Sequence, residues 1–121
     1  GGVIGGDVVL VYLGFSGLLV ALGVPLAMGK VPPNPLYGFR TPATQADPTL
    51  WYPVNARTGQ DLIGAGLVLG GVAWLLPELV PTLSPDAYMG AWTSGIVLAL
   101  LLVLLRGGLV LRRIQAERGE G

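Results

Sequence analysis

Long apolar segments alternate with short polar ones along this chain, and three apolar segments predict membrane-spanning helices. The first runs from Val8 to Met28 without a charged residue. As a helix, its ~21 residues would extend ~31 Å, which matches the hydrocarbon core of a bilayer. The third, residues 88–106, contains the most lipophilic stretch of the chain. The second apolar run, 62–76, is short for a crossing, so we expect this span to recruit its flanks and to cover 58–77.

The segment between the first two spans, residues 29–57, is predicted to be an ordered loop followed by a helix. Its first half is rich in proline, which opposes helix and favours extended backbone. Asp47 followed by Pro48 is typical of a helix N-terminus, so a helical extension at the membrane interface should lead into the second span. Pro53 indicates either that the regular helix begins close to Tyr52 or that its first turn is bent.

The end of the chain is polar. The third span is expected to end near Arg106, and residues 112–121 are predicted to form a polar tail. The helix would continue into Arg113 only if the pair Gly107–Gly108 does not break it. The whole pattern predicts one all-α integral membrane domain over residues 1–121, with three transmembrane helices, an ordered Pro-rich cytoplasmic loop and an interfacial helical extension before the second span.

The composition supports a membrane environment. Apolar residues make up 52% of the 121 positions and charged residues 12%, against ~25% charged residues in an average soluble domain. The alternative, three buried helices of a soluble protein, leaves too little polar sequence to cover those helices. Neither cysteine nor histidine occurs, so disulfides and thiolate metal sites are excluded and the commonest general base is missing. No metal site or cofactor is expected, and the zero net charge gives no indication of nucleic-acid binding.

Lysine and arginine are distributed unevenly over the polar segments, which predicts an orientation. The first connection and the C-terminal tail carry all the cations: Lys30, Arg40, Arg57, Arg106, Arg112, Arg113 and Arg118. The N-terminus and the second connection carry only acids: Asp7, Glu78 and Asp86. The positive-inside rule predicts that the N-terminus lies outside and the C-terminus in the cytoplasm. Aromatic side chains are expected to mark the inner interface at Tyr37, Trp51 and Tyr52, and the outer one at Trp74, Tyr88 and Trp92.

Small residues recur at spacings of four within the predicted spans, and such faces let helix backbones approach closely. The positions are Gly17 and Ala21 in the first span, Gly66 and Gly70 in the second, and Ala91, Gly95 and Ala99 in the third. We expect them to pack the three helices against one another. The alternative is oligomerisation or docking to a larger partner, and the spacing alone does not choose between the two.

The loop and the helix after it carry a two-part pattern, Asn-x3-Gly-x-Arg-Thr followed by Trp-x3-Asn-x3-Gly. Its seven positions are Asn34, Gly38, Arg40, Thr41, Trp51, Asn55 and Gly59. This pattern, lying between two spans, resembles the signature of the SdpI family, which is named for a bacterial membrane protein that gives immunity to a secreted sporulation-delay toxin peptide. The resemblance covers residues 31–59 closely and the following two spans by pattern. Pro53 departs from it, because a helix former is expected there, and the immunity protein has more than three spans.

The resemblance implies a non-catalytic, multi-pass protein of the bacterial cytoplasmic (inner) membrane that binds, resists or senses a membrane-active peptide. The founding member neutralises such a peptide and also sequesters a repressor at the membrane. A second hypothesis is an accessory structural subunit that braces a larger membrane complex through the small-residue faces. A third, an enzyme acting on lipid, would need an active site around Arg40 and Asp61. The expected partners are membrane lipid and either a membrane-active peptide or other membrane proteins.

Arg40 is the motif residue most open to a functional role. A guanidinium at the inner interface can bind a lipid phosphate or a peptide carboxylate with two hydrogen bonds. The structural alternative is a salt bridge to Asp47 or Asp61, or hydrogen bonds to loop carbonyls. Asp61 is a candidate ion-pair partner for Arg57 as well.

The other motif side chains are expected to support the loop. Asn34 and Thr41 should bond to the backbone of turns, and Asn55 should bond to the loop backbone rather than to a substrate. Gly38 is expected to adopt a positive φ or to allow a close backbone contact. Trp51 is expected to anchor its helix at the membrane interface. It shares one helix face with Asn55 and Gly59, and this face could meet the Pro-rich loop or the inner end of the first span.

Overall fold

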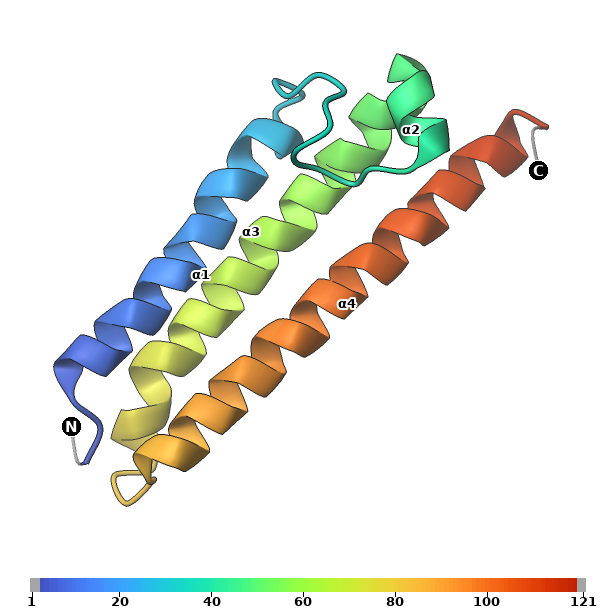
Figure 1. Ribbon diagram of the computed structural model, residues 1–121. Coiled ribbons are helices and arrows are strands. Elements are labelled where there is room, and N and C mark those ends of the chain that lie inside the picture. The colour runs from blue at the N-terminus through green and yellow to red at the C-terminus, as the bar shows by residue number, and fades with distance from the viewer. Residues whose placement is uncertain (1–2, 120–121) are drawn as a thin grey trace.

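The protein is all-helical in the computed structural model, which describes residues 3–119 (Figure 1). The helices are α1 (Gly6–Ala27), α2 (Pro42–Ala46), α3 (Pro48–Leu79) and α4 (Pro85–Glu117), and no strand occurs in the described range. The all-α prediction is confirmed. So is the number of crossing helices, because α1, α3 and α4 are each long and apolar enough to span a membrane.

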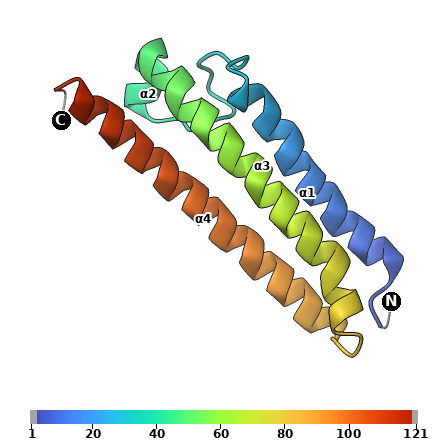
Figure 2. The same cartoon turned by 180° about the vertical axis from the view of Figure 1, so that it is seen from behind.

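The long helices are arranged with α3 in the middle. Both α1 and α4 pack along α3, and successive long helices run antiparallel (Figure 1, Figure 2). One end of the bundle, called the motif end below, holds the loop 28–41, α2 and the C-terminal turns of α4. The other, called the turn end, holds the start of α1 and the α3–α4 connection 80–84.

Two of the three long helices exceed the thickness of a bilayer core. At 1.5 Å per residue, the 32 residues of α3 and the 33 of α4 extend ~48–50 Å, whereas the hydrocarbon core is ~30 Å thick. The 22 residues of α1 match that core. Much of the extra length lies at the motif end, where the loop occupies the space beyond the last turn of α1 (Figure 1).

Residues at the helix ends explain where each helix begins and stops. Ser84 accepts a hydrogen bond of 3.1 Å from a backbone N–H of the first turn of α4, and Pro85 fills the first helical position. Asp47 caps α3 as its sequence predicted, by accepting from the N–H of Thr49 at 2.9 Å. The chain leaves α1 through Gly29, whose φ of 69° is the left-handed conformation that commonly closes a helix.

Pro53 lies inside α3, which begins at Pro48, four residues before Tyr52. A proline has no N–H, so the carbonyl four residues earlier, that of Thr49, loses its helical donor. The guanidinium of Arg118 supplies one, with Nη2 lying 2.8 Å from that oxygen. The proline that departs from the family pattern is therefore accommodated by a side chain from the end of α4.

Pro77 lies inside α3 as well, two residues before its end. It leaves the carbonyl of Ala73 without a helical donor. The hydroxyl of Tyr88, on α4, donates to that oxygen at 2.7 Å. Neighbouring side chains commonly satisfy such carbonyls in membrane helices, where water is absent.

The glycine pair in α4 does not break the helix. α4 continues through Gly107–Gly108 to Glu117, so the first part of the predicted polar tail is helical. Residues 120–121 of that tail lie outside the described range.

The core of the turn-end half is built from aromatic and small side chains. Leu69, Ala73 and Trp92 form its centre, and Trp92 Nε1 donates to the carbonyl of Leu69 at 3.2 Å. The ring of Tyr12 lies 4.5 Å from that of Trp92 and 5.5 Å from that of Tyr88, centroid to centroid, which connects α1 with α4. Tyr88 is 0% exposed and Trp92 4%. The prediction that they mark the outer interface is wrong, because both rings point between the helices.

Glycines set the close approach of α1 and α3. A Cβ placed on Gly59 would lie 2.4 Å from the backbone nitrogen of Ala27 and 2.5 Å from the carbonyl oxygen of Gly23. A Cβ on Gly66 would lie 2.6 Å from the carbonyl oxygen of Ser16. These distances are too short for any side chain, so the two helix backbones touch directly at these glycines.

The predicted small-residue faces divide into two groups. Gly66, Gly70, Gly95 and Ala99 lie between helices, where Gly70 meets Ser16 and Gly95 meets Leu69. The other group is exposed on the bundle surface: Gly17, Ala21 and Ala91. Intramolecular packing is therefore wrong for this second group. A spacing of four correctly indicates that small residues share one helix face. In helices that are apolar all round, the spacing does not show whether that face is turned inward.

Candidate functional site

Asn34 organises the Pro-rich part of the loop. Its Oδ1 accepts from the N–H groups of Leu36 and Tyr37 at 2.9 and 2.8 Å. Its Nδ2 donates to the carbonyls of Pro32 and Tyr37 at 2.8 and 3.1 Å. The amide thus forms all the hydrogen bonds available to it with loop backbone, as the sequence predicted.

The tip of the loop is fastened to α1 and α3 by two aromatic side chains. The Tyr37 hydroxyl donates to the carbonyl of Leu22 in α1 at 2.6 Å, and partial burial raises the pKa of this phenol. Trp51 is 0% exposed, and its Nε1 donates to the carbonyl of Val31 at 2.7 Å. The prediction of Trp51 as an interfacial anchor is therefore wrong, because its indole lies beneath the loop.

Gly38 and Asn55 meet at the centre of the site. Gly38 has a φ of 116°, and a Cβ there would lie 2.8 Å from Asn55 Oδ1 and 3.1 Å from the ring of Trp51. Asn55, only 1% exposed, accepts from the N–H of Phe39 and donates to the carbonyl of the same residue at 3.3 Å. The expectations for both residues, positive φ and bonding to loop backbone, are confirmed.

Thr41 and Thr44 turn the loop into α2 through a reciprocal capping box. The N–H of Thr41 donates to Thr44 Oγ1 at 2.8 Å, and the N–H of Thr44 donates to Thr41 Oγ1 at 3.2 Å. Thr44, 0% exposed, also donates its hydroxyl to the carbonyl of Phe39 at 3.1 Å. Phe39 is therefore held by α2 and α3 together.

Arg40 lies on the exposed side of the loop. Its Nη1 donates to the carbonyl of Pro35, so the loop-carbonyl alternative is the one that the structure shows. Gln45 closes the same side by donating to the carbonyl of Asn34 at 3.1 Å. No ion pair of Arg40 occurs within residues 3–119, whereas Asp61 pairs with Arg106 across α3 and α4 at 2.8 Å. The expected pairing of Asp61 with an arginine of the first connection is therefore wrong.

Phe39 connects the loop to α4. A Cβ added to Gly107 would lie 2.5 Å from the Phe39 ring, so the glycine provides the space that the ring fills. The ring is 8% exposed. Gly107 thus makes room for the Phe39 ring of the loop and does not interrupt α4.

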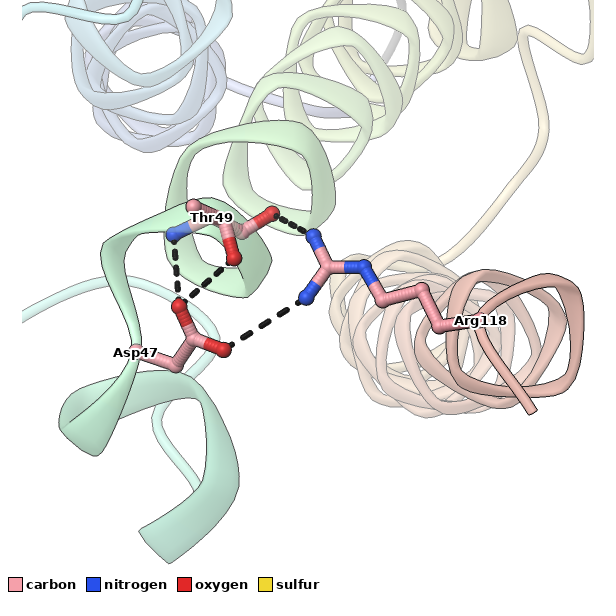
Figure 3. Close-up of polar contacts among 3 residues, drawn as sticks. All are labelled: Asp47, Thr49 and Arg118. Atoms are coloured by element: carbon pink, nitrogen blue, oxygen red, sulfur yellow. Dashed lines mark hydrogen bonds and ion pairs between the residues drawn. The ribbon is translucent and has the colours of Figure 1, made fainter. Parts of the chain in front are cut away.

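A polar cluster joins the start of α3 to the end of α4, and it consists of Asp47, Thr49 and Arg118 (Figure 3). Asp47 accepts from the N–H and hydroxyl of Thr49 at 2.9 and 2.6 Å, and its second oxygen lies 3.4 Å from Arg118 Nη1. The bonds from Thr49, followed by the charge of Arg118, hold the pKa of Asp47 below its usual value. The C-terminal turn of α4 is thereby tied to the first turn of α3.

The site is a braced structural unit in which few polar side-chain groups are left to bind a ligand. The motif amides and hydroxyls are bonded to backbone, and within residues 3–119 no cluster of three potential metal ligands occurs. Thr58 has the only buried side-chain oxygen or nitrogen without a partner in that range. A lone hydroxyl without an adjacent base is a weak nucleophile.

The sequence did not predict a role in the site for four residues: Phe39, Thr44, Arg106 and Arg118. Two sequence features point to Arg118 and Phe39. Pro53 implies an unpaired carbonyl at Thr49 and hence a donor from elsewhere. Phe39 stands between two motif residues, where a large ring needs a small facing residue.

Comparison with known proteins agrees with this arrangement. A family model of the SdpI/YfhL protein family matches residues 30–110, which include the loop, α2, α3 and most of α4. The chain is also 31% identical over 75 residues to the uncharacterized protein YfhL of Bacillus subtilis, and the match covers 62% of this chain and 60% of YfhL. This chain thus spans about three fifths of that relative. No solved structure matches it. The motif, the multi-pass helical architecture and the family match together establish that this chain belongs to the SdpI/YfhL family.

Proposed function

We propose that this chain is a non-catalytic membrane protein that binds a membrane-active peptide arriving from outside the cell, and so protects against it or senses it. The observation that carries the proposal is a hollow of about 290 Å³ at the turn end, between α1 and α3. Its lining residues are Ile4, Gly6, Val9, Leu10, Trp74, Pro77 and Glu78. Mainly apolar walls suit the apolar face of an amphipathic peptide.

The charge distribution supports this location. The turn end carries Asp7, Glu78 and Asp86 and no lysine or arginine, whereas every cation of the chain belongs to the motif end. Under the positive-inside rule the turn end faces outward in a bacterial cytoplasmic membrane. An acidic outer end attracts a cationic peptide before contact.

Peptide challenge of cells tests the proposal. Cells lacking the gene should become more sensitive to at least one peptide of a panel of cationic, membrane-active peptides, and the intact gene should restore resistance. Trp74→Ala should restore it at least about tenfold less well, because truncating a tryptophan in a binding hollow commonly costs 2 kcal/mol or more. Unchanged sensitivity across the panel would contradict the proposal.

A matched control lies on the same helix. Leu79 is 74% exposed, close to the 62% of Trp74, but does not line this hollow. Leu79→Ala should restore full resistance. Equal losses in both variants would mean that general packing near the turn end, rather than the hollow, is responsible.

The outward small-residue group favours a second candidate function, an accessory subunit of a larger membrane complex. A Cβ added to Gly17 on α1 would have no atom within 4 Å, and Ala21, one turn on, is exposed as well. A neighbouring helix could therefore approach this face closely. Gentle detergent extraction followed by mass spectrometry separates the candidates, since recovery of the chain alone contradicts the subunit role.

A further inference from the structure

A second hollow, at the motif end between α3 and α4, is lined by three arginines. It measures about 130 Å³, and its lining residues are Arg57, Arg106, Leu109, Val110 and Arg113. Neither the family motif nor the proposed peptide site includes any of them. Its position and chemistry are therefore independent of the function proposed above.

The antiparallel course of α3 and α4 explains how the arginines converge. The Asp61–Arg106 ion pair, 2.8 Å long, joins the two helices at one level. Arg57 lies four residues before Asp61, which is one turn nearer the motif end on the same face of α3. Arg113 lies seven residues after Arg106, two turns nearer the motif end on the same face of α4. The convergence thus follows from helix geometry.

The hollow has more positive than negative charge. No carboxylate is among its lining residues, and Asp61, which is bound to Arg106, offsets the charge of one of the three guanidinium groups. Arg57 and Arg113 are exposed, and within residues 3–119 they form no ion pair or hydrogen bond. Two guanidinium groups with donors to spare are suited to bind the oxygens of a phosphate.

An apolar surface continues directly from the charged hollow. Leu109, 63% exposed, is shared with a neighbouring hollow of about 280 Å³ that also includes Leu104, Leu105, Gly108 and Arg112. Leu104 and Leu105 lie on the turn-end side of the arginines, which is toward the membrane centre, and Leu109 lies between the levels of Arg106 and Arg113. Charge at the interface with apolar surface below it matches a phospholipid, whereas a free anion would use only the charged half.

We propose that Arg57, Arg106 and Arg113 bind the phosphate group of an anionic phospholipid, whose acyl chain lies along Leu104, Leu105 and Leu109. A zwitterionic lipid carries an amine that the two unpaired guanidinium groups would repel. Phosphatidylglycerol and cardiolipin are therefore preferred over phosphatidylcholine. The phosphate would lie between α3 and α4, and the acyl chain would lie along α4.

Native mass spectrometry of the full chain in detergent tests this site. The protein should retain phosphatidylglycerol or cardiolipin and release phosphatidylcholine at the same activation energy. Arg57→Gln with Arg113→Gln should weaken that retention by about tenfold or more, because each arginine near a membrane surface favours binding of an anionic lipid. Equal retention of phosphatidylcholine by the wild-type protein would overturn the proposal, whether or not the variant folds.

A control of equal charge separates the site from overall charge. Lys30→Gln with Arg40→Gln also removes two cations from the motif end, and neither residue lines either hollow, so lipid retention should persist. An equal loss in both double variants would overturn the proposal. Inorganic phosphate, added alone, should neither raise the melting temperature nor displace the lipid, and stabilisation by phosphate equal to that by lipid would instead identify a soluble anion.

Discussion

The polar motif side chains form their hydrogen bonds mainly with the backbone of the loop. Asn34 bonds to backbone donors and acceptors of one turn, and Thr41 and Thr44 cap the start of α2. Asn55 bonds to both the N–H and the carbonyl of Phe39. Sequence reasoning anticipated these roles because asparagine and threonine favour local backbone bonds. For Trp51 the interfacial-anchor prediction was wrong and the expected contact of its helix face with the loop was right. The sequence context of a tryptophan near an interface is the same whether its ring points to lipid or beneath a loop.

Removing the Asn55 amide tests how much this bracing contributes. Asn55→Ala leaves the buried N–H of Phe39 without its acceptor, whereas the Phe39 carbonyl keeps the bond from Thr44. One unsatisfied buried group lowers the free energy of unfolding by about 1–3 kcal/mol. Unfolding followed by circular dichroism in micelles measures it. Gln60→Ala, at an exposed amide on the same helix, should have no comparable effect, and equal losses would contradict the bracing role.

The backbone contact at Gly59 gives a second residue-scale prediction. A methyl group there would lie 2.4 Å from Ala27 N, so Gly59→Ala must separate α1 from α3, at a cost of about 1–3 kcal/mol for overpacking. Gly64→Ala is the matched control, because no atom lies within 4 Å of a Cβ there. It should leave stability unchanged or raise it by up to about 1 kcal/mol. Thermal melts that fail to separate the two variants would refute the close contact.

At the scale of elements, α4 compensates for both prolines within α3. Arg118 donates to the carbonyl freed by Pro53 and Tyr88 to the one freed by Pro77, near opposite ends of α3. Periodicity predicted where the helical segments lie. It did not decide whether α3 begins close to Tyr52 or continues through Pro53 with a bent first turn. The donors come from residues that are far away in the sequence, and a local pattern holds no information about them. α3 is therefore a long helix whose continuity depends on α4.

A double-mutant cycle tests this dependence. Arg118→Gln should speed hydrogen exchange in the last turn of α4 and the first turn of α3, because the carbonyl of Thr49 loses its donor. Pro53→Ala supplies a backbone N–H for the same carbonyl. In that background the effect of Arg118→Gln on the first turn of α3 should shrink. An undiminished effect would mean that the arginine acts only through its charge pairing with Asp47.

Acidification should loosen the same junction. The bonds from Thr49 and the charge of Arg118 lower the pKa of Asp47 in the folded state relative to its usual 3.8. Because the folded pKa is the lower one, the stabilisation is complete above the unfolded value and is lost as the pH falls through the folded value. The Thr49 amide resonance in micelles should therefore titrate with a midpoint below 3.8. Asp47→Asn should abolish the titration, and a midpoint at or above 3.8 would contradict the assignment.

At the scale of the whole molecule, charge and length divide the bundle into two unlike ends. All seven lysines and arginines belong to the motif end, and α3 and α4 extend ~48–50 Å, so part of each projects beyond a bilayer core. The number of membrane spans and the charge pattern could be read from the sequence, since both depend only on residue type along the chain, whereas the short helix α2 was not predicted. Which glycine face joins α1 to α3 could not, because helices destined for lipid are apolar on every side.

The proposed orientation can be tested directly because the chain contains no cysteine. Thr82→Cys marks the turn end and Ala116→Cys the motif end, and both positions are exposed. A membrane-impermeant maleimide should label the Thr82→Cys variant in intact cells, whereas the Ala116→Cys variant should react only after permeabilisation. The unmodified chain controls for background, since it offers no thiol. The reverse labelling pattern would turn the basic end outward, and a peptide arriving from outside would then meet the arginines rather than the hollow beside Trp74.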